Sequence, residues 1–220
     1  MAKDDHHCCC GQDFERLFDD REAARDLRAW QKDGLPDSTA ELVEALRAEG
    51  VAGARVLDVG AGIGMVHLEL LAAGAASAVD VDLSRAYLAV AQREAEQRGL
   101  ADRITYRYGD LVDVAATLPP ADVVALDRVI CCYADLAGLL AAAVASGPRV
   151  IGLVHPTDAW WMRAPISLFN AFGRILRRGH FFYAHRRFEI DRLLGDRGYL
   201  VRHRGGRRIW RVSLYARPEA

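Results

Sequence analysis

The chain has 220 residues, about half of them apolar and arranged in short runs, which is enough for one α/β domain with a buried core. No run approaches the roughly 20 uncharged apolar residues that cross a bilayer, and no secretory signal follows Met1, so we expect a cytoplasmic protein. The net charge of −1 hides an asymmetry, because residues 160–220 hold 14 arginines and only four acids. A basic third suits an anionic substrate, RNA or an anionic membrane surface, or is simply a solvated arginine surface.

Near the N-terminus stands the sequence His6-His7-Cys8-Cys9-Cys10, whose spacing is not that of a zinc site, so we predict no metal centre there. A charged helix is expected over residues 12–33, and a second helix over 38–49 with Ser38 or Thr39 as its cap. Strands are then predicted at 55–59, 77–81, 104–108, 121–126, 149–154, 199–204 and 209–216, with helices at 65–73, 84–98, 136–145 and 187–195. This alternation predicts an α/β fold with a mostly parallel sheet covered by helices on both faces.

The strongest local pattern is a glycine-rich turn after the first predicted strand. Glycine stands at every second position, as Gly60, Gly62 and Gly64, which lets the backbone turn sharply and meet a ligand directly. A dinucleotide-binding turn would need another glycine where Met65 stands. Asp58 before the turn would repel a pyrophosphate, whereas it can accept hydrogen bonds from the ammonium group of S-adenosylmethionine (SAM). A purely structural turn is the alternative.

Two further acidic positions follow the next two strands. Asp80 and Asp82 compete to accept the ribose hydroxyls, and the spacing to the next helix, which Ser84 can cap, favours Asp82. After the third strand, Asp110 can take the adenine amino group while Leu111 packs on the ring. All these positions lie at strand ends, where open α/β sheets bind ligands.

These three segments, Leu57–Gly64, Asp82-Leu83-Ser84 and Gly109-Asp110, resemble the class I SAM-dependent methyltransferase superfamily. The resemblance covers about residues 38–216. It implies SAM as cofactor and a Rossmann-like sheet of seven strands whose last strand runs antiparallel. We therefore divide the chain into an N-terminal tail and helical lid (1–37) and a methyltransferase domain (38–220) with a lid insertion at about 156–186.

A second resemblance is to the magnesium-protoporphyrin O-methyltransferases. It rests on Phe14-Glu15-Arg16, on the strand-four segment Ala125–Tyr133, and on the aromatic insertion after strand five. Cys132-Tyr133-Ala134 stands where that family usually has His-Tyr-Pro.

Methyl transfer from SAM needs a nucleophile held in line and shielded from water, and only some nucleophiles need a base. The candidates for catalysis are Asp127, Tyr133 and His155, after strands four and five. Each has a structural alternative: a strand cap, a roof over the adenosine and a hydrogen-bonded strand-end histidine, respectively. For Cys131-Cys132, small apolar packing is favoured over a covalent role.

The insertion at 160–178 has apolar residues at helical spacing, with arginines nearby. We expect a lid packed on the sheet, with a helix lying on a membrane surface as the alternative. His180, His185, Arg186 and Arg187 are then placed to meet a substrate carboxylate.

Together these patterns predict a SAM-dependent methyltransferase acting on an oxygen of an aromatic or hydrophobic acidic small molecule. Peripheral membrane contact is compatible with this reaction, and nucleic acid is not the expected partner. Two alternatives remain open: an RNA methyltransferase that uses the basic C-terminal third, and a non-catalytic protein that binds SAM or a metal.

Overall fold

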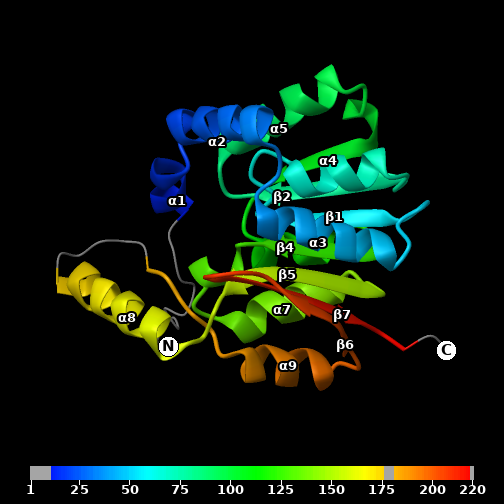
Figure 1. The fold of residues 1–220 in the computed structure, drawn as a ribbon. Coiled ribbons are helices and arrows are strands. Elements are labelled where there is room, and N and C mark those ends of the chain that lie inside the picture. The colour runs from blue at the N-terminus through cyan, green and yellow to red at the C-terminus, as the bar shows by residue number, and fades with distance from the viewer. Residues whose placement is uncertain (1–10, 176–180, 219–220) are drawn as a thin grey trace, which may run out of the picture.

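Seven strands form one mixed sheet with helices on both faces (Figure 1). The computed structural model describes residues 11–175 and 181–218. The strand order is β3-β2-β1-β4-β5-β7-β6, and β7 runs antiparallel to both of its neighbours, which confirms the predicted sheet. The strands are β1 (Arg55–Val59), β2 (Ser77–Asp82), β3 (Ile104–Tyr108), β4 (Val123–Asp127), β5 (Val150–Pro156), β6 (Leu200–Gly205) and β7 (Trp210–Ala216).

Helices connect most of the strands and cover the sheet. They are α1 (Gly11–Leu17), α2 (Asp20–Asp33), α3 (Asp37–Ala48), α4 (Met65–Ala72), α5 (Arg85–Gln97), α6 (Leu111–Val114), α7 (Leu136–Ala145), α8 (Trp160–Ile175) and α9 (Arg187–Gly195), with short 3-10 turns η1 (Ala101–Arg103), η2 (Ala115–Thr117) and η3 (Ile130–Cys132). Within the described residues, no helix combines the length and apolar character needed to cross a bilayer.

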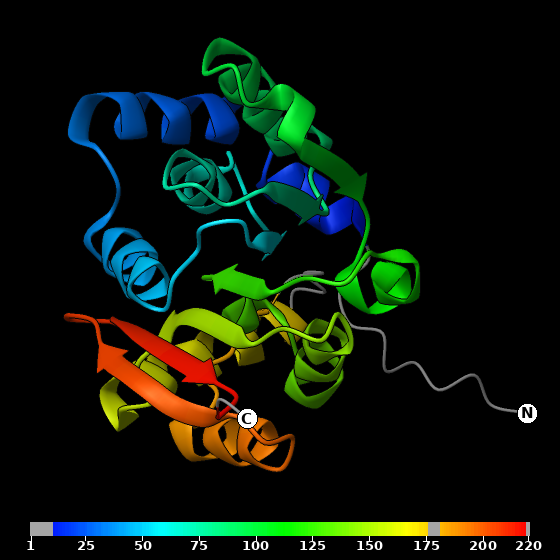
Figure 2. The same ribbon diagram turned by 90° about the vertical axis from the view of Figure 1, so that its right-hand side faces the viewer.

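The core has two halves because successive residues of a strand point to opposite faces of the sheet. Leu57 packs in one half with residues of α7 and α9, while its neighbour Val56 packs in the other with residues of α3 and α4. Figure 2 shows helices on either side of the sheet. The central strand β4 is covered on both sides, and Val123 to Leu126 are fully buried. Burial on both faces explains why this strand is a continuous apolar run.

The described N-terminal residues form two helices instead of the single helix predicted over 12–33. The carboxylate of Asp19 accepts hydrogen bonds from the backbone N–H groups of Arg21 and Glu22, at 2.9 and 3.0 Å. Asp19 therefore caps a new helix, α2, and the chain changes direction before it.

The prediction that Ser38 or Thr39 caps the next helix is wrong. Helix α3 already begins at Asp37, with Pro36 at the capping position and no side-chain cap. Ser38 and Thr39 lie buried in its first turn. The Thr39 hydroxyl instead donates to the Asp127 carboxylate at 2.6 Å, which ties α3 to the end of β4.

Candidate functional site

The glycine turn between β1 and α4 lies at the edge of the sheet where the parallel strands end. Gly60, Gly62 and Gly64 have φ angles of +56°, +58° and +86°, a region that residues with side chains rarely adopt. A Cβ atom on Gly60 would stand 2.7 Å from a methyl carbon of Val129, and one on Gly64 would stand 2.9 Å from the ring of His67. The turn therefore needs glycine for both conformation and space.

Asp82 at the end of β2 closes the other side of this turn. Its carboxylate accepts the backbone N–H of Gly62 at 2.9 Å and that of Ser84 at 2.7 Å. Burial raises the pKa of Asp82 to about 6, although these two N–H groups oppose the shift. Ser84 caps α5, as predicted, by accepting the N–H of Tyr87.

The two other acids at this end of the sheet are buried behind the turn and do not line the cavity described below. The carboxylate of Asp58 accepts the backbone N–H of His67 at 3.1 Å and lies 3.0 Å from Nδ1 of the same residue. Neither carboxylate oxygen of Asp80 has a hydrogen-bond partner among the described residues. Burial, with the nearby charges of Asp82 and Asp58, raises the pKa of Asp80 well above its usual range.

Asp110 and Tyr133 meet at the end of β3. Asp110 caps α6 by accepting the N–H of Val112 at 2.9 Å, and the Tyr133 hydroxyl donates to the same carboxylate oxygen at 2.5 Å. Burial and this hydrogen bond raise the pKa of Tyr133, so its hydroxyl stays protonated and is committed to Asp110. Leu111 lies beside them and lines the same cavity.

The end of β4 carries an ion pair. Asp127 accepts the Thr39 hydroxyl, and its other carboxylate oxygen lies 3.2 Å from Nε of Arg128. Arg128 has a φ of +60°, which for a residue with a Cβ costs about 1–2 kcal/mol. The guanidinium also lies 5.9 Å from the ring of Trp210. The ion pair with Asp127 and the contact with Trp210 hold the side chain of Arg128 beside the cavity.

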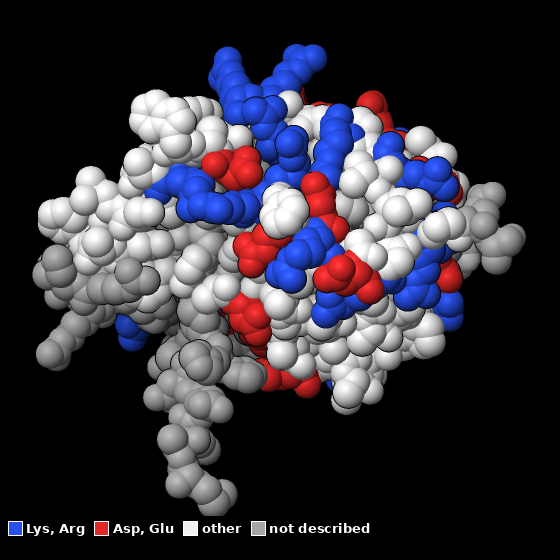
Figure 3. Space-filling model, turned by 90° about the horizontal axis from the view of Figure 1, so that it is seen from below, with Lys and Arg blue, Asp and Glu red and all other residues white. Residues whose placement is uncertain are grey.

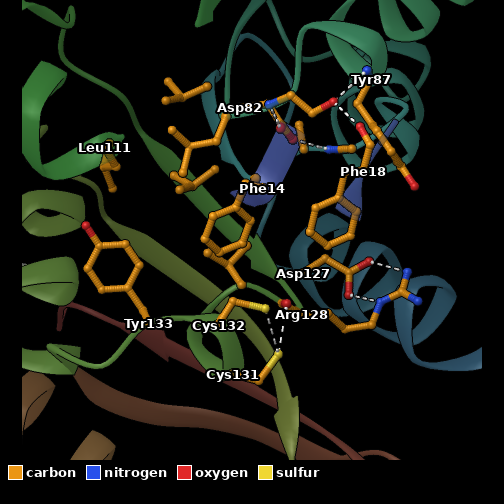
Figure 4. Close-up of a pocket in the computed structure, with 18 of the residues that line it drawn as sticks. Phe14, Phe18, Asp82, Tyr87, Leu111, Asp127, Arg128, Cys131, Cys132 and Tyr133 are labelled. Atoms are coloured by element: carbon orange, nitrogen blue, oxygen red, sulfur yellow. Dashed lines mark hydrogen bonds and ion pairs between the residues drawn. The ribbon is translucent and has the colours of Figure 1, made fainter. Parts of the chain in front are cut away.

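A single cavity of about 340 Å³ joins these features to a group of aromatic and sulfur-containing residues (Figure 4). Phe14 of α1 and Phe18, directly after this helix, face it, with ring centroids 6.0 Å apart. The Phe18 carbonyl accepts the hydroxyl of Ser84 at 2.6 Å, which fixes the end of α1 over the turn. The end of the cavity away from Asp82 is closed by Phe14, Arg128, Cys131, Cys132, Tyr133, Phe182 and Trp210.

Comparison with known proteins identifies the domain. The fold matches that of magnesium protoporphyrin IX methyltransferase from Synechocystis PCC 6803 with bound SAH, with a TM-score of 0.74 and 19% identity over 94% of this chain and 99% of that one. Residues 56–146 match a family model described as a methyltransferase domain. Residues 56–146 thus match a methyltransferase domain, and the fold around them is that of solved methyltransferases with SAM or SAH bound. The Synechocystis protein has also been solved with SAM itself, the cofactor that domains of this class use.

Two other relatives resemble parts of the methyltransferase domain or its fold. The ribosomal protein L11 methyltransferase of Deinococcus radiodurans is 34% identical over 115 residues, which cover 51% of this chain and 41% of that protein. The chain thus matches less than half the length of this curated relative. An O-methyltransferase family protein from Burkholderia thailandensis shares the fold, with a TM-score of 0.64 and 18% identity over 91% of this chain and 63% of that one.

The methyltransferase domain does not bring His155 to its cavity, although it was a candidate base there. His155 is 2% exposed, and its two ring nitrogens lie 3.0 Å from the Pro156 carbonyl and 3.2 Å from the Ser213 hydroxyl. Burial lowers the pKa of His155, so the ring is neutral at pH 7, and it lies buried against Ser213 of β7. Its side chain points away from the cavity because residues alternate along β5.

The two adjacent cysteines do line the cavity. Their sulfur atoms lie 3.8 Å apart, and the Cys131 thiol donates to the Arg128 carbonyl at 3.1 Å. The hydrogen bond with Cys132 and burial raise the pKa of Cys131 well above its usual range. Cys131 is therefore a packed thiol and not a thiolate nucleophile. Among the described residues, no three His, Cys, Asp or Glu side chains are grouped to hold a metal, and His6–Cys10 lie outside those residues.

The segment that precedes α9 is hydrogen-bonded to residues 128–135, the loop between β4 and α7 that lines the cavity and that we call the roof loop. The backbone N–H of Tyr183 donates to the Cys131 carbonyl at 2.7 Å, and Nε2 of His185 lies 2.8 Å from the Tyr133 carbonyl. His185, predicted to meet a substrate carboxylate, thus binds the chain instead. His180 lies outside the described residues.

Sequence reasoning missed several residues of this cavity, among them Phe14, Phe18, Arg128, Phe182 and Trp210. Phe14 and Phe18 had a usable signal, since two aromatic residues four apart share one face of a helix. The others come from segments far apart in the sequence, and no local pattern unites them.

Proposed function

We propose that this chain transfers the methyl group of SAM to an oxygen atom of an aromatic or hydrophobic small molecule that carries a carboxylate. The observation that supports it is the continuity of the cavity. Its glycine-turn end offers Asp82, and its far end is aromatic with one guanidinium, that of Arg128. An apolar acid is the acceptor class that fits such walls.

In this proposal the cofactor lies along the carboxyl ends of β1 to β3. Asp82 accepts the two ribose hydroxyls, because each of its oxygens has a lone pair left beyond its backbone contact. Asp110 and Leu111 take the adenine, and the bare backbone of the glycine turn allows close approach. When bound, SAM supplies an electrophilic methyl group. Asp58 acts as a positioning residue, through His67 under the turn.

The end of the cavity away from Asp82, which we call the acceptor end, contains no available base among the described residues. The carboxylate of Asp127 is paired with Arg128, the hydroxyl of Tyr133 donates its hydrogen bond to Asp110, and His155 lies outside the cavity. A phenol would need a base, whereas a carboxylate arrives already ionised. The remaining tasks are orientation, by Arg128, and exclusion of water, by Phe14, Phe18 and Phe182. The geometry thus favours ester formation on a carboxylate.

The test is a mass-spectrometric assay of the purified chain with SAM and individual acceptors. Magnesium protoporphyrin IX comes first, since the Synechocystis methyltransferase is named for it. A panel of aromatic carboxylic acids and matched phenols follows. We expect one added methyl group on a carboxylic acid and none when that carboxylate is masked as an amide. Methylation of phenols alone would contradict the carboxylate assignment, and SAM binding without any product would contradict the proposed acceptor class.

A further inference from the structure

Helix α8 exposes its apolar side to solvent. Trp161, Leu168 and Phe172 follow one another at helical spacing with Ala164 and Pro165, so they share one face, which we call the outward face. Trp161, Leu168 and Phe172 are 46%, 61% and 59% exposed.

The opposite side of α8 faces the protein. Asn170 is buried there and binds the main chain of Phe182 twice, donating from its amide nitrogen at 2.6 Å and accepting the N–H at 3.0 Å. Apart from Asn170 and Gly173, none of the described side chains of α8 is buried, so the helix does not pack on the sheet as a lid. Figure 1 shows it standing beside the sheet.

An apolar helix face exposed to water is unfavourable by about 25 cal/mol for each Å² that a partner could cover. The chemistry of that partner follows from the surrounding charges. Residues 159–188 contain six arginines and no acid or lysine, in a chain whose net charge is −1. In Figure 3, the part of this surface where α8 lies is almost uncharged, and both basic and acidic side chains lie next to it.

We infer that the outward face of α8 binds an anionic membrane surface, with the helix lying in the interface. Tryptophan and phenylalanine side chains are well suited to the boundary between headgroups and acyl chains. The exposed Arg186 and Arg187 at the start of α9 supply positive charge next to this helix for lipid phosphates.

This surface is linked to the cavity. Phe182, which Asn170 holds against α8, is also one of the residues that line the acceptor end. A hydrophobic acid dissolved in the membrane would therefore enter the cavity beside the helix that binds the membrane. The membrane contact itself does not depend on the proposed reaction.

The test is flotation of the full chain with vesicles of phosphatidylcholine alone and of phosphatidylcholine mixed with phosphatidylglycerol, without SAM or acceptor. We expect binding to the mixed vesicles, much weaker binding to the neutral ones, and a decrease with added salt. Leu168→Gln combined with Phe172→Gln should weaken binding by about tenfold or more, because two apolar side chains no longer enter the interface.

The matched control is Leu200→Gln combined with Val201→Gln on β6, where the two side chains are 59% and 45% exposed. It removes a similar exposed apolar pair and should leave vesicle binding unchanged. Equal melting temperatures would show that both variants fold.

Equal binding by wild type and the α8 variant, or no preference for anionic vesicles, would overturn the proposal. Two other results would also overturn it and reassign the face. A wild-type dimer that the α8 variant converts to monomer, without vesicle binding, would mean that a second copy covers it. A raised acceptor KM without vesicle binding would mean that α8 closes on the cavity.

Discussion

The two ends of the cavity are built in different ways. The glycine-turn end is made by segments that lie close to the carboxyl ends of β1, β2 and β3, and its contacts are mostly to backbone atoms. The acceptor end is assembled from α1, from the loop after β4, from the segment after α8 and from β7, and its contacts are side-chain packing. The first end can bind only what fits a fixed backbone, whereas the second can change by substitution without disturbing the sheet.

Removing the Asp82 carboxylate is expected to have the largest effect. Asp82→Ala deletes the proposed acceptor of both ribose hydroxyls and the partner of the Gly62 N–H. At about 1.5–3 kcal/mol for each charge-assisted hydrogen bond, SAM affinity should fall by about a hundredfold or more, as measured by calorimetry.

Asp80→Asn is the control for that variant, since Asp80 is buried and lies outside the cavity. It should leave SAM affinity within about twofold. The reverse pattern, with loss only in the Asp80 variant, would move the ribose contact to Asp80.

Gly60→Ala tests whether the turn depends on space as well as conformation. The new Cβ would meet Val129 at 2.7 Å and would also adopt φ near +56°. We expect a loss of about 2–4 kcal/mol in the free energy of unfolding, measured with urea, from strain and overpacking together.

Gly50→Ala separates the two causes, because Gly50 has φ of +79° with nothing within 4 Å of its added Cβ. It should lose only the strain of about 1–2 kcal/mol. Adding Val129→Ala to Gly60→Ala should recover the difference, and no recovery would show that the contact with Val129 does not limit the turn.

At the acceptor end, Arg128→Gly should raise the KM of the acid acceptor by about tenfold or more, through loss of a charge-assisted hydrogen bond. SAM affinity should stay unchanged, because Arg128 does not touch the glycine turn. Steady-state kinetics with the acceptor identified by mass spectrometry would measure this.

Arg208→Gly is the matched variant, since Arg208 also has positive φ, at +53°, but lies outside this cavity. Both substitutions relieve about 1 kcal/mol of backbone strain, and only Arg128→Gly should change KM. An equal change of KM in both variants would show that Arg128 does not bind the acceptor.

The smallest effect is on pH dependence, and it again concerns the glycine-turn end. The folded pKa of Asp82 is raised to about 6, so its contribution to stability is present below the unfolded pKa and is lost as pH rises through about 6. Ribose hydroxyls favour the ionised carboxylate, so SAM affinity should have the opposite trend. It should fall by up to about tenfold between about pH 7.5 and about pH 5. Asp82→Asn should abolish that slope, and a slope that persists would assign it to another group.

The sheet could be predicted well from the sequence. A strand buried on both faces is a continuous apolar run, and a strand buried on one face alternates apolar and polar residues. The predicted bounds of β1, β3, α7 and α9 agree with the structure. The choice of Asp82 over Asp80 also agrees with the cavity lining, because a strand-end acid before a helix cap has a defined position.

The acceptor end could not be predicted in the same way. The ring of His155 is bound by the Ser213 hydroxyl of β7, a partner 58 residues further along the chain that the sequence of β5 alone does not reveal. The break before α2 depends on one capping carboxylate, Asp19, in a segment whose charge pattern suits a continuous helix. That Phe18 lies over the glycine turn follows from this break.

The hydrogen bonds from Tyr183 and His185 to the roof loop connect the outside of the molecule to the cofactor end. Tyr133 lies between them, with its carbonyl 2.8 Å from His185 and its hydroxyl on Asp110. A tilt of α8 would be transmitted through Phe182 and its neighbours to this tyrosine. Tyr133 would therefore couple the two sites. If Asp110 binds the adenine as proposed, contact of α8 with a surface and the affinity for SAM would each depend on the other.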